Sequence, residues 1–345
     1  TTAALLPQHS LYTALPYLQM PLLSWGQAGV LGLLGAGWAG YQLLISLGIY
    51  MVLAGCYFAL NTVRSRHPAV LLMTWLALLG SFSVITIAGT TSNHALQLVL
   101  AGALLWLCLS GAATPQRALA AGVLCGLMIS AKLNSLPFVL PLLFWLWQGE
   151  RRFKTALYAG IGGFFALLPV LWIFVQDPAA FWYANITAPL LNTALRGSST
   201  MGEVAAMLYR QLAMPPVLAL VGSLLFCMIQ VSARLPKPRL HLWGVFMAAG
   251  LGGALIPGKV YDFHFAPFML VACAFCGDML AAHIGAATAQ VRWRLVCFLL
   301  VPVMLIGAGT LATSGLLKSE PAKSVTMERI AASYRQALAA NPTCA

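Results

Sequence analysis

The chain has 345 residues, of which 61% are hydrophobic and only 8% are charged, and its mean hydropathy is +0.87. Soluble globular domains are usually about 45–50% apolar, so this composition excludes a soluble globule and indicates an all-α, polytopic membrane protein. At about 20 residues per transmembrane helix, the length suffices for about ten spans with their loops. It leaves no room for a large soluble domain.

The first 39 residues have a different character from the rest of the chain. Prolines and aromatic residues such as Pro7, Tyr12, Pro16 and Tyr17 alternate there with leucines, which is typical of helices that lie in the membrane interface. No signal-like segment precedes them, and the sequence starts at Thr1. We therefore expect 1–39 to be an incomplete first outer loop, with an earlier helix missing from the sequence.

Ten apolar runs follow and define a transmembrane domain over residues 40–316, with an outer tail at 317–345. The expected helices are 40–63, 68–88, 94–112, 117–131, 133–149, 154–176, 214–232, 240–257, 264–284 and 292–316. The stretch of about 177–213 is predicted to be the longest outer loop.

The net charge of +12 follows the expected topology. Basic residues gather in the short loops on one side of the expected bundle, which the positive-inside rule makes cytoplasmic: Arg64, Arg66, Arg117, Arg151, Arg152, Lys154, Arg234, Lys237, Arg239, Arg292 and Arg294. These cations are not interleaved with aromatic residues as a nucleic-acid groove requires. The charge therefore indicates orientation in the plasma (inner) membrane, and no nucleic-acid partner is expected.

Several other features of the expected helices have structural interpretations. Asp278, near the inner end of its helix, is expected to pair with a cytoplasmic arginine. The run containing Gly160, Gly162 and Gly163 is expected to permit close helix packing. Most cysteines lie within the expected helices, and the Cys273-x-x-Cys276 pair has no second ligand pair. No metal ligand set or nucleotide fingerprint is recognised, although the need for a divalent metal stays open.

Lys132 stands out because it interrupts the apolar run GVLCGLMISAKLNSLPFVLPLLFWLW. An ammonium group at this depth costs several kcal/mol unless it reaches the interface or finds an anion. Two interpretations are open: Lys132 extends to the membrane surface from a helix end, or it binds an anion.

A second outer turn, IPGKVYDFHFAPFML at 256–270, places Lys259, Tyr261, Asp262 and His264 between two apolar segments. Two lysines on the same side, each in a turn between apolar segments, favour a shared anion-binding cluster. Lys132, Lys259 and His264, helped by Arg210 or Arg196, are expected to hold a phosphate at the outer membrane boundary.

A phosphate with a lipid tail suits this position, because the tail would lie along the helices. If the phosphate carries a sugar it is also a leaving group, and cations stabilise the charge that develops on it. A carboxylate must then act as general base on the acceptor. The outer side offers Asp177, Glu203, Asp262, Glu320 and Glu328.

The order of these features resembles the lipid-linked sugar transferases of the GT-C superfamily, in the branch of aminoarabinose transferases and protein O-mannosyltransferases. The matching stretches are YTALPYLQMPLLSWGQAGVLGLLGAG, AAGVLCGLMISAKLNSLPFVLPLLFWLW and GKVYDFHFAPFMLVACAF. The resemblance implies a GT-C-like fold and a polyprenyl-phosphate-linked sugar donor. It also implies that Lys132 and Lys259 contact the lipid phosphate in a cavity lined by Tyr261 and His264.

The resemblance also implies a catalytic carboxylate in the first outer loop, yet this sequence has no acid before Glu150. Asp262 is a candidate substitute base, although an ion pair with Lys259 or His264 would explain it equally well. Where the family often carries an acid, the turn TTSNH has Asn93 and His94. A neutral hydrogen-bonding role, or an N-cap of the next helix by Asn93, is expected there.

Two alternatives to a glycosyltransferase stay open. A lipid or polysaccharide transporter or flippase would place polar groups near the bilayer midplane, whereas here they gather at one face. A noncatalytic subunit with the same fold is the other alternative. The sugar and the acceptor, whether lipid, glycan or protein, are not specified by the sequence.

Overall fold

The structure is a computed structural model, and it describes residues 20–35, 38–65, 67–88, 92–230 and 235–287. Within these ranges the regular elements are all helical, which confirms the all-α fold. The interfacial run 1–19, the expected helix 292–316 and the tail 317–345 lie outside the described residues.

The other nine expected helices are all present in the described ranges. They are α3 (Trp38–Leu60), α4 (Pro68–Leu79) with α5 (Phe82–Ala88), α6 (Asn93–Leu109), α7 (Pro115–Ala131), η1 (Leu133–Phe138) with α8 (Val139–Trp147), α9 (Arg152–Gln176), α13 (Pro215–Gln230), α14 (Lys237–Leu255), and η3 (Asp262–Phe265) with α15 (Ala266–Ala286). An additional helix, α2 (Leu22–Leu34), precedes them.

Three of the described helices are long and apolar enough to cross a membrane: Gln42–Leu60, Arg152–Gln176 and Asp262–Ala286. Two helix pairs meet the same test but are sharply bent, α4 with α5 by 63° and α12 (Met201–Leu212) with α13 by 80°. Counting each pair as one span gives five. Four shorter apolar helices accompany them, Leu22–Leu34, Asn93–Leu109, Pro115–Ala131 and Leu133–Trp147.

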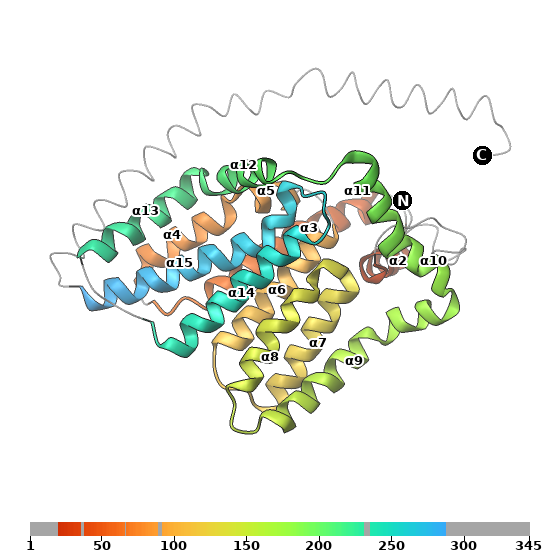
Figure 1. Cartoon of the computed structure of the whole chain (residues 1–345), viewed down its shortest axis with the longest axis horizontal. Coiled ribbons are helices and arrows are strands. Elements are labelled where there is room, and N and C mark those ends of the chain that lie inside the picture. The colour runs from red at the N-terminus through yellow and green to blue at the C-terminus, as the bar shows by residue number, and fades with distance from the viewer. Residues whose placement is uncertain (1–19, 36–37, 66, 89–91, 231–234, 288–345) are drawn as a thin grey trace, which may run out of the picture. The chain divides into compact units, whose positions relative to one another are not determined.

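The expectation of one long loop over about 177–213 was wrong, because short helices fill it. These are α10 (Pro178–Trp182), the π-helical η2 (Tyr183–Thr187), α11 (Ala188–Arg196) and α12. Local capping explains two of them: Asp177 caps α10, and Thr200 with Glu203 forms a capping box at the start of α12. This segment connects α9 to α13, and Figure 1 shows it along the outside of the packed helices.

The helices alternate in direction, so the described loops gather at two opposite ends. At one end, Asn134 of η1 donates to the Gly253 carbonyl near the end of α14. At the other, Arg239 at the start of α14 reaches the carbonyls of Thr62 and Leu109. We refer to these as the Lys132 end and the Arg239 end. The described loops expected on the outer side lie at the Lys132 end, and those expected in the cytoplasm lie at the Arg239 end.

The close contact of α7 with α9 depends on small residues (Figure 1). A Cβ atom at Gly122 would collide with the Ala159 carbonyl, and one at Gly126 would lie 2.7 Å from the Gly163 oxygen. Gly162 likewise faces the Leu119 carbonyl. Small residues four apart on both helices therefore allow the backbones to touch. This confirms the expected role of the α9 glycines, except that Gly160 faces open space.

A buried ion pair organises the Arg239 end. Arg239 Nε lies 2.7 Å from Asp278 Oδ2, and both side chains are almost fully buried. Asp278 also accepts from the Trp243 indole and from the Arg64 backbone N–H. The expected pairing of Asp278 with an arginine is therefore confirmed. Its carboxylate links α14, α15 and the segment that follows α3.

Candidate functional site

Lys132 occupies the break between α7 and η1. Its backbone is extended, at φ −160° and ψ 126°, and its N–H donates to the Met128 carbonyl to close α7. The side chain is half-buried, with Nζ 2.7 Å from His94 Nε2 at the start of α6. Burial lowers the pKa of the Lys132 ammonium to about 7. A nearby phosphate would favour the charged form.

Aromatic rings surround this lysine. Nζ lies 5.9 Å from the centroid of the Phe263 ring. The His94 ring meets Phe263 edge-on at 4.5 Å and lies 5.5 Å from the His264 ring. Tyr261 stacks on Phe263 with ring centroids 5.3 Å apart. The start of α6 and the 261–264 turn therefore form an aromatic wall beside the ammonium.

His264 is buried, and its position is fixed by its own turn. The Tyr261 backbone N–H donates to Nδ1 over 3.3 Å. Since Nδ1 accepts this bond, a neutral His264 ring carries its proton on Nε2. His264 is therefore arranged to donate a hydrogen bond from Nε2.

A buried polar network holds the break in place. The Gln97 amide donates to Asn134 Oδ1 at 3.2 Å and to Ser135 Oγ at 2.9 Å. Asn134 in turn donates to the Gly253 carbonyl at 3.0 Å. These bonds tie η1 to α6 and α14. They fix the position at which Lys132 leaves the backbone.

A cavity of about 250 Å³ opens beside Lys132. Polar side chains of Lys132, Asn134, Asn185 and His264 contribute to its wall, and the remaining lining is mostly apolar: Met20, Leu133, Ile186, Pro189, Leu190, Ile256 and Pro257. The segment from η2 to α11 closes one side of it. A cationic group thus meets an apolar groove at the Lys132 end.

The turn after α14 brings Lys259 to the same end. Gly258 adopts φ +70°, a conformation that glycine tolerates best. The Gly258 carbonyl accepts from the Ser199 N–H, and the Thr193 hydroxyl donates to the Pro257 carbonyl. Lys259 makes no side-chain hydrogen bond or ion pair with any described residue and does not line the cavity.

Asp262 and Arg210 form a separate ion pair. Arg210 Nη2 lies 2.9 Å and 3.1 Å from the two Asp262 oxygens. Gln211 Nε2 adds a contact to Asp262 of 3.5 Å, while its carbonyl accepts from the Ser83 N–H. The expected ion pair of Asp262 thus involves Arg210, on α12, in place of Lys259 or His264. Neither Asp262 nor Arg210 lines the cavity.

The other described carboxylates at this end also serve local structure. Asp177 Oδ1 accepts from the Ala180 N–H at 2.9 Å, and Glu203 accepts from the Thr200 N–H at 2.9 Å. Glu320 and Glu328 lie outside the described residues. Within the described ranges, no carboxylate lines the cavity, and no cluster of potential metal ligands is found.

Sequence reasoning missed His94 as a site residue. The signal was present: His94 begins a helix at the same end as Lys132. The expectation that Asn93 caps this helix was also wrong. Ser92 is the N-cap, and its hydroxyl accepts from the Ala95 N–H. Asn93 is the first helical residue and is buried.

Comparisons with known proteins identify the family of the chain and its fold. The model of glycosyltransferase family 87 matches residues 28–256, well over half of the chain. No curated protein matches it. The crystal structure of ArnT from Cupriavidus metallidurans bound to undecaprenyl phosphate is similar, with a TM-score of 0.61 and 15% identity. The apo structure of the same protein gives 0.59 and 16%.

Both matches cover 92% of this chain but only 59% of the ArnT chain. The chain therefore spans less than two thirds of the length of the structures that it matches. At this level of identity, the likeness shows that the chain shares the fold of ArnT.

Proposed function

Since the chain belongs to glycosyltransferase family 87, we propose that it transfers a sugar from a polyprenyl-phosphate donor to an acceptor at the Lys132 end. The fold match to a protein bound to undecaprenyl phosphate supports this donor class. The gathering of cations in loops at the Arg239 end supports an extracytoplasmic, periplasmic position for the Lys132 end of the plasma membrane.

The observation that carries the proposal is Lys132 beside an apolar groove. A polyprenyl phosphate presents a charged headgroup and a long hydrocarbon tail, and the cavity offers matching surfaces. Lys132 would bind the phosphate, while Leu133, Ile186 and Leu190 would contact the first part of the tail. A soluble nucleotide sugar has no hydrocarbon tail that could make these apolar contacts.

The transfer breaks one bond at the sugar C1, forms another there and moves one proton. The bond between the sugar C1 and the phosphate oxygen breaks, the acceptor oxygen forms the new bond to C1, and the acceptor proton passes to a base. Lys132 stabilises negative charge on the departing phosphate. His264 Nε2–H donates to a donor oxygen, and Tyr261 positions His264 through its backbone N–H. Lys259 lies at the same end but outside the cavity, so it would contact only a part of the headgroup that extends beyond the cavity.

The transfer also needs a general base. Asp262 is the candidate that the sequence offers nearest to the cavity, but its oxygens accept from Arg210. It would have to leave this pair to receive a proton. We favour a positioning role for Asp262 and Arg210, which together hold η3 against α12.

A noncatalytic, donor-binding subunit is the second candidate function. It is favoured by one observation, that Asp177, Glu203 and Asp262 all have structural partners in the described part of the chain. Such a protein would bind the lipid phosphate without transferring the sugar.

Transfer from a polyprenyl-phosphate sugar by the full-length protein in proteoliposomes tests both candidates. Lys132→Ala is expected to reduce donor binding and turnover by at least about tenfold, the loss of one charge-assisted hydrogen bond. Lys154→Ala, at the Arg239 end, is the matched control. Donor binding without turnover would support the noncatalytic subunit. Equal donor binding by the two variants would overturn the proposed site.

A further inference from the structure

A second cavity, of about 350 Å³, lies at the Arg239 end, away from the candidate donor site. We propose that it binds the phosphate group of an anionic phospholipid. The cavity is lined by parts of α6, α8 and α14 and by the loops next to them, including Arg64, Leu109, Gly111, Trp145, Gln148 and Arg239.

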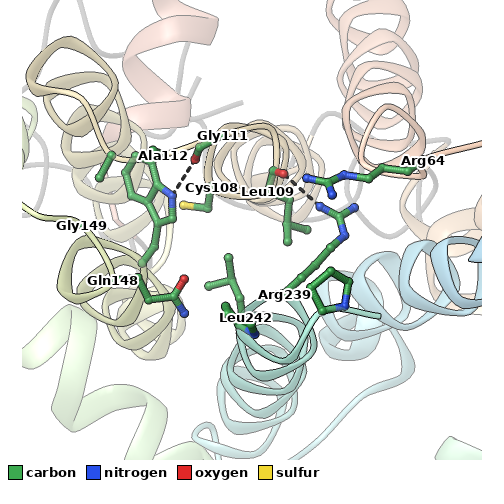
Figure 2. Close-up of a pocket in the computed structure, with 13 residues that line it drawn as sticks. Arg64, Cys108, Leu109, Gly111, Ala112, Gln148, Gly149, Arg239 and Leu242 are labelled. Carbon is green, nitrogen blue, oxygen red and sulfur yellow. Dashed lines mark hydrogen bonds between the residues drawn. The ribbon is translucent and has the colours of Figure 1, made fainter. Parts of the chain in front are cut away.

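The cations of this cavity exceed the carboxylates available to them. Figure 2 shows the guanidinium groups of Arg64 and Arg239 close together beside the Leu109 carbonyl. Arg239 is neutralised by Asp278, whose two oxygens already accept from Arg239, Trp243 and the Arg64 backbone. The Arg64 side chain is exposed and makes no hydrogen bond or ion pair with any described residue.

Arg117 adds positive charge at the edge of the cavity. Its guanidinium lies against Gly111 and donates to the Leu107 carbonyl and the Ser110 hydroxyl. Glu150 is exposed and follows the lining residue Gly149, but it does not line the cavity. The cavity therefore has a net positive charge. An anion bound between the guanidinium groups of Arg64 and Arg239 would reduce their mutual repulsion.

Neutral groups complete a site for a phosphodiester. Gln148 extends into the cavity from the end of α8 (Figure 2), where its amide can donate to a phosphate oxygen. Cys108, Leu109, Trp145 and Leu242 supply an apolar wall for the glycerol backbone and the first acyl carbons of the lipid. The volume falls in the range of small-molecule sites, about 300–1,000 Å³.

The position favours a lipid over a soluble anion. Trp147, close to the cavity in sequence, is 67% exposed, and the Arg152 guanidinium lies 4.6 Å above its ring. An exposed tryptophan beside arginines at a helix end is typical of the membrane interface. Basic pockets between helices at this depth bind anionic headgroups.

Native mass spectrometry of the full-length protein tests the site, with phosphatidylglycerol and phosphatidylcholine as probes. We expect selective retention of phosphatidylglycerol, reduced about fivefold by Arg64→Ala, as for the loss of one interfacial arginine. Arg151→Ala removes an equal charge from the same end without touching the cavity and is the matched control. Arg64→Lys, which keeps the charge, should retain most of the binding.

Three results would overturn the proposal. The first is equal retention of the two lipids, and the second is equal losses in Arg64→Ala and Arg151→Ala. The third is no phosphatidylglycerol retention together with binding of inorganic phosphate at millimolar concentration, which would assign the site to a soluble anion. Donor transfer at the Lys132 end is a separate readout, so failure here leaves the proposed function untouched.

Discussion

Lys132 Nζ and His94 Nε2 lie 2.7 Å apart, although the two residues belong to different helical segments. The contact joins the break after α7 to the first turn of α6. A neutral imidazole accepts from the ammonium group without cancelling its charge. In its charged form, Lys132 is thereby held in position with its positive charge available to an anion.

The depressed pKa of Lys132, about 7 because of burial, predicts that donor binding depends on pH. The charged form is present below this pKa and is lost as pH rises through it. A donor phosphodiester stays singly charged over this range, so its affinity should fall by roughly tenfold or more between pH 6 and pH 9. Titrations of a polyprenyl-phosphate sugar at several pH values measure this.

Lys132→Arg is the control for that titration, because arginine stays protonated throughout. Its donor affinity should be nearly independent of pH, whatever its absolute value. If the variant and the parent protein show the same pH profile, Lys132 is not the titrating group.

His94 is expected to act through Lys132. Replacing it with Ala removes the acceptor for the ammonium and leaves a space beside Phe263, so donor binding should weaken by about 1 kcal/mol, roughly fivefold. His94→Gln keeps an acceptor and should restore part of the binding. Adding His94→Ala to Lys132→Ala should cause little further loss, since the two residues act as one unit. Full additivity in this double-mutant cycle would contradict the role.

Much of the fold could be predicted from the sequence because apolar runs in a membrane protein have few alternatives to helix. The pairing of Asp278 was predictable for a related reason: a buried carboxylate needs a partner, and most of the arginines were expected at the same, cytoplasmic end. By contrast, the contacts of His94 and Asp262 depend on helices that are distant in sequence. The sequence pointed to Lys259 or His264 as the partner of Asp262, whereas Arg210 lies 52 residues away on α12.

The buried pair of Arg239 and Asp278 should be important for stability. Asp278→Ala leaves Arg239 without its counter-ion, and breaking such a pair costs about 3–5 kcal/mol. Asp177→Ala, which removes a half-buried helix cap, should cost only about 1 kcal/mol. Unfolding of the two variants in the same detergent gives the comparison. The double replacement Arg239→Met with Asp278→Leu should be less destabilised than Asp278→Ala alone, and a larger loss would contradict this account.

Glycine substitutions test the packing of α7 on α9. Gly122→Ala places a Cβ against the Ala159 carbonyl and should destabilise the protein by about 1–3 kcal/mol. Gly160→Ala lies in the same helix pair but meets open space, and it should stabilise by about 0.5–1 kcal/mol because alanine favours the helix. Effects of the same sign at both positions would show that the close approach is not what decides stability.

Membrane orientation can be tested with introduced cysteines. The described native cysteines Cys56, Cys108, Cys125, Cys227 and Cys273 are buried, and Cys276 is half-buried. In a background with Cys276→Ser, Cys297→Ser and Cys344→Ser, Lys259→Cys should react with a membrane-impermeant maleimide in cells whose plasma membrane is intact. Arg151→Cys should react only after that membrane is permeabilised, because the basic Arg239 end is expected to be cytoplasmic. The reverse labelling pattern would place the candidate donor site on the cytoplasmic side and contradict the proposed periplasmic transfer.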